Sequence, residues 1–334
     1  MRISVLIPAR NEMFLKNTIE DILKNKRSST EIIVGLDGQW ANPSIIQHPD
    51  VNVIYVPQAI GQRAMTNMCA KIARGKYLIK CDAHCSFDEG FDIKLLQGFK
   101  QSGDDVVMVP VMRNLWAFDW VCKKCGNSWY QGPTPTYCCS DKKGKTKNEE
   151  CDSTVFERDV KWIGKTSPQS KSYCFDSEPH FQYFGEWTKS SAYREQLKTG
   201  LTETMSLQGS FFMVTKENYW KLKLSDEEFG SWGSQGIEVA SKMWLSGGRV
   251  LVNHNTWYAH MFRTQGGDFN FPYPQSNRQV QEAKKKAKEL FFKGKFKNQT
   301  KPLSWLIDKF NPIKGWNDED LIKLKKEEKC LYTT

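Results

Sequence analysis

Short apolar runs alternate with helical stretches over the first third of the chain. Apolar runs bounded by turn formers predict buried strands, and apolar positions spaced three and four apart predict helices. The predicted strands cover residues 3–7, 31–36, 51–56, 77–81 and 105–111. The predicted helices cover residues 14–23, 61–74 and 90–99. This alternation with short links predicts an α/β fold, in which a parallel, doubly wound sheet carries helices on both faces.

The pattern changes at Cys122. From there to about residue 171 the chain is rich in Lys, Ser, Gly, Pro and Cys and shows no sustained period. Core-like sequence then returns, with predicted strands and helices at 209–214, 237–245, 249–252 and 277–293. We therefore predict four segments: residues 1–121, a cysteine-rich insertion at 122–175, a second core segment at 176–263, and a basic C-terminal helical extension at 264–334.

Polar side chains gather just after the predicted strands. They are Glu12, Asp37, Asp82 and His84. Ligands of open α/β sheets bind at the carboxyl edge of the strands, so a nucleotide site is expected there. Asp82 and His84, one residue apart, can ligate the same divalent cation, and mixed oxygen and nitrogen ligation suits Mn²⁺ better than Ca²⁺. The chain has neither a Gly-x-Gly-x-x-Gly motif nor a P-loop, which argues against a dinucleotide dehydrogenase and a P-loop NTPase.

The cysteines of the insertion predict a structural zinc site. Cys122-Lys-Lys-Cys125-Gly has the form of a zinc-ribbon knuckle. Five cysteines within 30 residues of polar sequence cannot form a core. The predicted ligands are Cys122, Cys125, Cys139 and Cys151, with Cys138 as the alternate to Cys139, and with Cys174 or His180 as possible substitutes. Four thiolates leave no open position, so this zinc would have no catalytic part.

Charge and hydropathy narrow the class of partner. The formal net charge is +10, and residues 274–334 contribute 15 Lys+Arg against 8 Asp+Glu, or +7. Such an excess favours an anionic partner, nucleic acid before a membrane surface, although a solvated helical face explains it equally well. No signal peptide and no apolar run of membrane-spanning length is visible, so we expect a cytoplasmic protein (host cytoplasm if viral) without membrane insertion. The sequence does not indicate an oligomeric state.

Several motifs, in their order along the chain, resemble those of GT-A glycosyltransferases. The nearest patterns are the family 2 glycosyltransferases and the polypeptide N-acetylgalactosaminyltransferases, and the latter have a similar Asp-x-His-Cys, a Trp-Gly-Gly loop and a His-x-Phe-Arg. The resemblance covers roughly residues 2–121 and 200–263. The motifs are Pro8-Ala-Arg-Asn-Glu12, Asp37-Gly38, residues 61–75, Asp82-Ala-His84-Cys85, Trp232-Gly233, Gly247-Gly248 and His260-Met-Phe-Arg263.

This resemblance implies a UDP-sugar donor and a bound Mn²⁺ or Mg²⁺ that supports the departing diphosphate. The implied metal ligands are Asp82, His84 and His260. The implied donor contacts are Pro8, Ala9, Glu12, Asp37, Arg63, Asn67 and Asp82. His260 could instead be a buried histidine beside aromatic residues. Asp37 could be only a turn former before Gly38.

The residue that would deprotonate the acceptor is where the sequence departs from these families. Family 2 enzymes have an acidic pair after a glycine-containing loop, and the N-acetylgalactosaminyltransferases have Glu-Asn. Here the matching residues are Gln235 and Gly236, which cannot take a proton. Glu238 lies three residues after Gln235 on the same helix face and is predicted as the catalytic base, although the helix dipole alone favours a carboxylate there. Because one family inverts and the other retains configuration, the stereochemical outcome stays open.

The acceptor is predicted from charge. The basic C-terminal segment and the zinc insertion favour a large anionic acceptor, and our interpretation is DNA with a hydroxymethylated base, as in bacteriophage genome modification, flipped out to reach the site. Protein or a soluble glycan is the alternative acceptor. A function of another class is a non-catalytic nucleic-acid-binding protein on this scaffold. Gln235 and Gly236 favour that alternative, whereas three intact metal ligands argue against it.

Overall fold

The computed structural model describes residues 2–263, 273 and 277–332. Its strands are β1 (Ile3–Ala9), β2 (Thr30–Asp37), β3 (Val51–Val56), β4 (Tyr77–Cys81), β5 (Cys85–Phe87), β6 (Val106–Cys122), β7 (Ser128–Tyr130), β8 (Phe156–Ser170), β9 (Tyr173–Phe175), β10 (Phe181–Tyr183), β11 (Leu201–Glu203), β12 (Phe211–Thr215) and β13 (Arg249–His260). Its α-helices are α1 (Leu15–Asn25), α2 (Gln62–Ile72), α3 (Phe91–Ser102), α4 (Ser191–Leu197), α5 (Lys216–Lys221), α6 (Gln235–Leu245), α7 (Asn277–Ala287), α8 (Leu303–Phe310) and α9 (Asp318–Tyr332).

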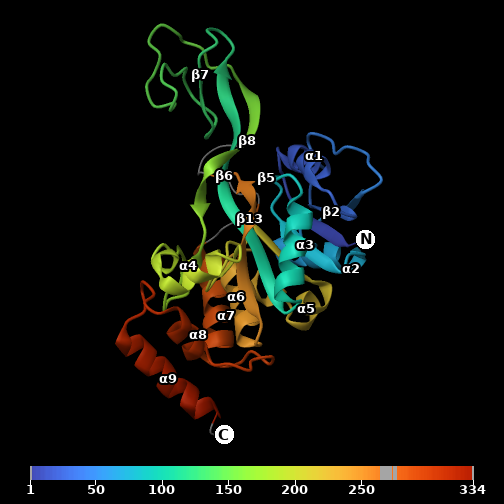
Figure 1. Ribbon diagram of the computed structural model, residues 1–334. Helices are drawn as coiled ribbons and strands as arrows, with labels where there is room; N and C mark the ends of the chain where they lie inside the picture. The colour runs from blue at the N-terminus through green and yellow to red at the C-terminus, as the bar shows by residue number, and fades with distance from the viewer. Residues whose placement is uncertain (1, 264–272, 274–276, 333–334) are drawn as a thin grey trace.

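An eleven-stranded sheet runs through the molecule in the order β11-β13-β6-β12-β4-β1-β2-β3, with β5 paired to β13 and both β7 and β8 paired to β6 (Figure 1). Helices cover both faces, as predicted. Successive residues of β1 point to opposite faces. Leu6 packs in the core cluster that contains residues of α2, α6 and α8, while Val5 and Ile7 pack in the cluster that contains α1 and α3.

The prediction of an all-parallel sheet is wrong. Strands β1, β2, β3 and β4 are parallel, but β12 lies antiparallel to both β4 and β6. The apolar run of β12 reveals burial, but burial carries no information about strand direction. The sheet is therefore mixed, and it places the ends of β4 and β13 near each other through β5.

Two strands are longer than predicted, and six were not predicted, namely β5, β7, β8, β9, β10 and β11. β6 continues beyond residue 111 to Cys122, and β13 continues beyond residue 252 to His260 after a register shift. β8 pairs with the outer part of β6 through several register shifts. Most of its residues are exposed or half-buried, so its sequence lacks the alternation that marks a strand.

The outer part of β6, together with β7, β8 and the loops between them, forms a projecting arm (Figure 1). We call residues 115–170 the arm. It has its own small core, in which Phe118, Trp120 and Trp129 pack beside four buried cysteines. The arm contains most of the predicted insertion, whose bounds stay a prediction.

The C-terminal segment packs against the main body. The predicted basic helix is α7 followed by a turn of π-helix through Phe292. Leu306 and Phe310 of α8 belong to the core cluster of the central sheet. Residues 264–272 and 274–276 of the predicted extension lie outside the described part of the chain. Within the described residues, no helix has both the length and the apolarity that a membrane span requires.

Candidate active site and candidate metal centres

Asp82 lies at the carboxyl end of β4, which runs between β1 and β12. Buried apolar residues of β4 hold the strand in the sheet, and the backbone N–H of Asp82 donates to the carbonyl of Ser210 at 2.9 Å. The chain then turns through His84 into β5. Cys85 of β5 pairs with His260 of β13, and Met261 N–H donates to the His84 carbonyl at 3.1 Å. This register brings His260 beside His84 although 176 residues separate them.

The three residues predicted as metal ligands lie together. Nε2 of His84 is 3.1 Å from Nε2 of His260, which is 3.3 Å from Oδ2 of Asp82. One ligand atom from each lies within 4.8 Å of the others. We call Asp82, His84 and His260 the histidine cluster.

Glu12 orients His84 from behind. Its Oε2 lies 3.2 Å from Nδ1 of His84 and accepts a hydrogen bond from the Arg263 guanidinium at 2.5 Å. Burial raises the pKa of Glu12, but His84 and Arg263 outweigh burial and hold that pKa below its usual value. The ionised carboxylate favours the His84 tautomer that carries hydrogen on Nδ1, which leaves the Nε2 lone pair facing His260 and Asp82.

Asp82 is divided between two sets of partners. Its Oδ1 forms an ion pair with Lys80 and accepts a hydrogen bond from Gln62 at 3.3 Å, while its Oδ2 faces His260. Burial raises the pKa of Asp82, but the charge of Lys80 and the hydrogen bond with His260 outweigh burial. The net effect holds that pKa below its usual value, so the group is ionised. Burial lowers the pKa of His260 to about 4, so its imidazole is neutral at physiological pH.

The donor set of the histidine cluster fits a divalent transition metal such as Mn²⁺. It offers one carboxylate oxygen and two imidazole nitrogens that lie within 4.8 Å of one another, a combination that suits Mn²⁺ better than Ca²⁺. The Glu12–His84 contact matches the carboxylate–histidine–metal arrangement that orients imidazole ligands in metal sites. Three protein ligands leave coordination positions for substrate.

Two cavities meet at Asp82. The first, of about 170 Å³, is lined by Pro8, Glu12, Gln62, Asp82, Ala83, His84, Gln208, Trp232, His260, Phe262, Arg263 and Tyr273. The second, of about 210 Å³, is lined by Gln62, Lys80, Asp82, Phe181, Leu207, Gln208, Gly209, Ser210, Trp232, Gly233, Ser234, Gln235, Gly236 and Ile237. We call them the histidine cavity and the glutamine cavity. They share Gln62, Asp82, Gln208 and Trp232, so a ligand that reaches from one to the other passes the histidine cluster.

Of the predicted donor contacts, Pro8, Glu12 and Asp82 line the histidine cavity, and Ala9 and Asp37 line neither cavity. Ala9 is 1% exposed in the core. Both carboxylate oxygens of Asp37 accept backbone hydrogen bonds, from Ile60 at 2.7 Å and Gly61 at 2.9 Å. Asp37 therefore fixes the turn that begins α2, and its contact with the donor stays a prediction.

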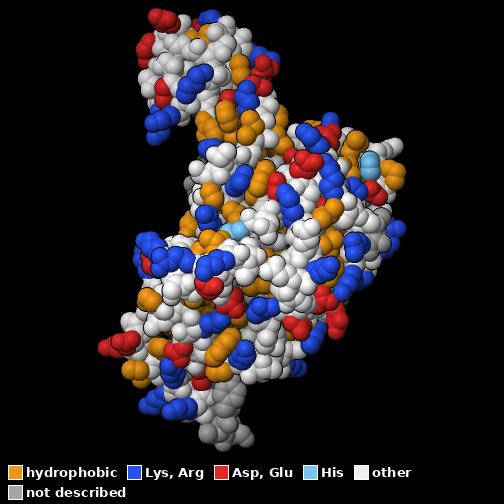
Figure 2. All heavy atoms as spheres, in the orientation of Figure 1, with side chains coloured by type: hydrophobic (Ala, Val, Ile, Leu, Met, Phe, Trp, Pro, Cys, Tyr) orange, Lys and Arg blue, Asp and Glu red, His pale blue; other side chains and the backbone are white. Residues whose placement is uncertain are grey.

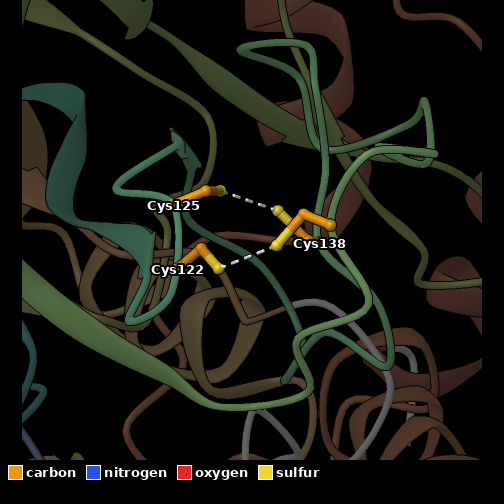
Figure 3. A group of neighbouring side chains, drawn as sticks. Cys122, Cys125 and Cys138 are labelled. Carbon is orange, nitrogen blue, oxygen red and sulfur yellow. Dashed lines mark hydrogen bonds between the residues drawn. The ribbon is translucent and has the colours of Figure 1, made fainter.

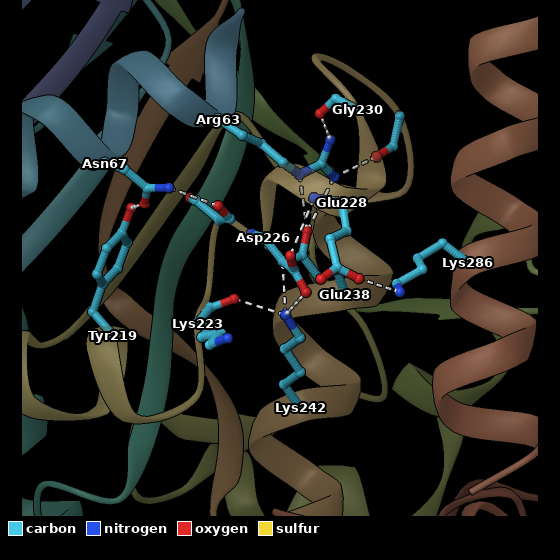
Figure 4. A network of polar contacts seen from close by, with 12 residues as sticks. Arg63, Asn67, Tyr219, Lys223, Asp226, Glu228, Gly230, Glu238, Lys242 and Lys286 are labelled. Carbon is cyan, nitrogen blue, oxygen red and sulfur yellow. Dashed lines mark hydrogen bonds and ion pairs between the residues drawn. The ribbon is translucent and has the colours of Figure 1, made fainter. Parts of the chain in front are cut away.

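Arg63, Asn67 and the predicted base Glu238 line neither cavity. Figure 4 shows them within a network of polar contacts. Glu238 is fully buried, and its carboxylate is 3.0 Å from the Arg63 guanidinium and 3.1 Å from Lys242. A buried carboxylate paired with two cations, outside both cavities, has a structural role in this arrangement, and its assignment as catalytic base stays a prediction. Arg63 donates to the carbonyls of Gly230 and Gly233. The ion pair of Arg63 with Glu238 thus holds the loop that carries Trp232.

Asn67 has a similar structural role. Its amide donates to the Ser225 carbonyl at 3.0 Å and to Glu227 at 2.8 Å, and its oxygen accepts from Tyr219 at 2.7 Å. Its polar atoms are engaged in this way, and the contact of Asn67 with the donor stays a prediction. Arg63 and Asn67 lie in the first and second turns of α2 and line neither cavity, whereas Gln62 at the start of the helix donates to Asp82.

Four cysteine thiols lie together in the arm (Figure 3). The sulfur atoms of Cys122 and Cys151 are 3.7 Å apart, and those of Cys125 and Cys138 are 3.5 Å apart. Sulfurs that share a tetrahedral zinc at about 2.3 Å lie about 3.8 Å from one another. Burial raises the pKa of the Cys122 thiol, but backbone N–H groups of the knuckle lower it to about 6, which favours the thiolate. We call these four residues the thiol cluster.

Cys138 and not Cys139 belongs to the thiol cluster. The Cys139 sulfur lies 3.8 Å from the Tyr137 carbonyl, outside the group. The preference for Cys139 is therefore corrected to the alternate, Cys138. The two residues are adjacent in an irregular loop, so the spacing from Cys125 could not distinguish them.

The sequence predictions missed several residues that line the cavities. Lys80 precedes Asp82 by two residues and so shares its face of the sheet, a signal that period-two reasoning could have used. Gln62 and Gln208 stand at the start of α2 and before β12, where nothing in their local sequence indicates a site. Tyr273 comes from the segment after the His260 motif and lines the histidine cavity with 6% of its surface exposed.

Comparison with known proteins defines the class of the fold. A crystal structure of GalNAc-T7 with UDP, GalNAc and Mn²⁺ superposes with a TM-score of 0.57 over 98% of this chain and 54% of that chain, at 15% identity. The fold is thus the mixed, curled α/β sheet of GT-A glycosyltransferases.

Sequence comparison finds relatives of the N-terminal part of the chain. Residues 4–124 match the model of Glycosyl transferase family 2. The putative polypeptide N-acetylgalactosaminyltransferase 13 of Drosophila melanogaster is 30% identical over 109 residues, which are 33% of this chain and 18% of that protein. Polypeptide N-acetylgalactosaminyltransferase 3 of Drosophila melanogaster is 24% identical over 203 residues, 61% of this chain and 24% of that protein. The chain therefore spans less than a quarter of the length of these relatives.

Proposed function

We propose that the protein is a metal-dependent glycosyltransferase that moves a sugar from a UDP-sugar to a hydroxyl acceptor. The observation that carries this proposal is the histidine cluster, whose three ligand atoms lie within 4.8 Å of one another and border the histidine cavity. The names of the relatives and the UDP and Mn²⁺ in the GalNAc-T7 structure support the same reaction class.

The residues of the histidine cavity suit a nucleoside diphosphate. A divalent cation held there would neutralise the diphosphate while the bond to the sugar breaks. Glu12 keeps the His84 ring in place, and Arg263 brings a guanidinium to the same wall. Phe262 and Tyr273 add aromatic surface against which a base or ribose can pack.

The test is the release of UDP from a panel of UDP-sugars in the presence of Mn²⁺. His84→Ala should lower the rate by on the order of 100-fold or more, because the cation then loses one of three ligands. His180→Ala is the matched control, because His180 is exposed, lines neither cavity, and its ring contacts the carboxylate of Asp176. A parent protein that consumes no UDP-sugar, or a His84→Ala variant as active as the parent, would refute the proposal.

For the acceptor we propose DNA with a hydroxymethylated base, as in modified viral genomes. The support is the excess of +7 from residue 274 to the end of the chain. Figure 2 shows lysines and arginines interspersed with acidic residues on the visible face, so the support is net charge and not a single basic stripe. Binding to such DNA should weaken steeply as salt rises. Salt-insensitive or absent binding, with transfer to a protein or a soluble glycan instead, would contradict DNA as acceptor.

We propose Zn²⁺ as the occupant of the thiol cluster. Four thiolates at tetrahedral spacing form a closed site, so the metal would stabilise the arm and take no part in chemistry.

A further inference from the structure

The glutamine cavity is bordered by hydrogen-bond donors whose capacity is not fully used. Its wall includes the first turn of α6, an 11-residue helix that begins at Gln235. The first N–H groups of a helix have no partner within the helix and carry the positive end of its dipole. Ser234, the residue before the helix, has a left-handed φ of 51° and makes no side-chain cap. The N-terminus of α6 is therefore left uncapped where it borders the cavity.

The side chain of Gln235 independently indicates that this cavity binds a ligand. The residue is 9% exposed and lines the cavity, and its Nε2 is buried without a hydrogen-bond partner. Leaving a buried amide donor unpaired is costly, so such groups are normally bonded to protein, water or ligand. Gly236 beside it has no space for a side chain, because an added Cβ would lie 1.7 Å from the Leu207 carbonyl oxygen. This close approach keeps the helix start against the cavity wall.

Lys80 provides the third donor. Its ammonium contacts Asp82 and donates to the Gly209 carbonyl at 2.8 Å, and an ammonium has three donors, so one remains. Within the described lining of this cavity, Lys80 and Asp82 are the sole charged side chains. Their charges cancel, and the carboxylate of Asp82 is already shared by Lys80, Gln62 and His260.

We infer that the glutamine cavity binds an anionic oxygen group, a carboxylate or a phosphate, through the start of α6, the Gln235 amide and Lys80. The inference rests on the proposed transfer reaction, because the cavity adjoins the histidine cluster. The anion has two sources: a carboxylate on the donor sugar, as in a UDP-hexuronic acid, or an acidic group on the acceptor. A carboxylate at residue 235 would repel such a group, and here that residue is a neutral glutamine.

The experiment compares UDP-glucuronic acid with UDP-glucose by isothermal titration with Mn²⁺ present, for the parent and for Gln235→Glu. The parent should bind UDP-glucuronic acid about tenfold more tightly, the effect of one charge-assisted hydrogen bond, and Gln235→Glu should abolish that preference. Gln235→Ala removes the amide without adding charge and should give an intermediate preference. Thermal unfolding of each variant shows that it is folded.

A second arm addresses the acceptor as the source. Here the protein is saturated with UDP and Mn²⁺ and then titrated with glucuronate, inorganic phosphate and glucose. If the anion belongs to the acceptor, the two UDP-sugars bind equally, but glucuronate or phosphate binds the parent about tenfold more tightly than it binds Gln235→Glu. Equal binding in both arms would overturn the inference. Absence of any UDP binding would instead refute the proposed function, and the two failures are thus distinguishable.

Discussion

The thiol cluster and the histidine cluster are both groups of metal-ligating side chains, but they differ in closure. In the thiol cluster, four sulfurs lie within 4.8 Å of one another, and four is the number of ligands that a closed tetrahedral zinc site requires. In the histidine cluster, three ligands converge on one side and a cavity lies on the other. The difference indicates which group can act on a substrate: the closed cluster stabilises its surroundings, and the open one has positions that a substrate can occupy.

The two clusters also differ in how the chain assembles them. The thiols all come from residues 122–151 of the arm, whose small core holds few other buried side chains. The ligands of the histidine cluster come from the ends of β4 and β13, which the central sheet and its two large apolar clusters hold in place. Loss of metal should therefore unfold the arm locally, whereas the sheet should keep its fold without a cation.

The largest expected effect is that of Cys138→Ser. The variant should lose its zinc, about one ion per chain in the parent, and the arm should unfold, because structural zinc contributes on the order of 10 kcal/mol of binding free energy to small domains. Metal analysis and hydrogen exchange of residues 115–170 provide the measurement. Cys139→Ser is the matched control and should keep both zinc and protection. Equal loss of zinc in the two variants would contradict a closed zinc site. Hydrogen exchange of the arm that does not change when a chelator is added would contradict it as well.

The next effect concerns the buried ion pairs of Glu238, which need no metal to balance their charges. Glu238→Ala leaves the buried cations Arg63 and Lys242 without their shared partner, and should lower the free energy of unfolding by about 3–5 kcal/mol. The control, Glu195→Ala, removes an exposed pair with Lys198 and should cost less than about 1 kcal/mol. Denaturant unfolding measures both. UDP release by the folded fraction should persist. Complete loss of UDP release in a folded Glu238→Ala protein would instead support the prediction that Glu238 is the catalytic base.

These contrasts show which parts of the site were predictable from the sequence. Apolar strands with polar ends placed Asp82 and His84 at an edge of the sheet, because that pattern is local. The approach of His260 depends on the pairing of β5 with β13, and only the resemblance of its motif suggested it. Local pattern also separates the arm from the core, since composition changes near Cys122.

The features that the sequence did not reveal have a common physical cause. Glu238 and Arg63 are 175 residues apart, and neither sequence context shows that each is the partner of the other. A carboxylate near a cavity and one sealed in an ion pair look alike in the sequence. Cys138 and Cys139 differ only in the direction that an irregular loop gives their side chains. Long-range partners and loop direction come from tertiary packing, and no local pattern encodes them.

The smallest expected effect comes from Glu12, which contacts the histidine cluster through His84 and has no counterpart in the thiol cluster. Glu12→Gln replaces the carboxylate that orients His84, and should raise the Kd for Mn²⁺ by about 10–100-fold without unfolding the protein. Titration of Mn²⁺ in the presence of UDP measures this change. Glu20→Gln is the control, because Glu20 lies half-exposed on α1 in a loose 3.8 Å pair with Lys16. An unchanged Kd in a folded Glu12→Gln protein would mean that His84 does not hold the cation through the ring atom opposite Glu12, since the carboxylate acts only through that imidazole.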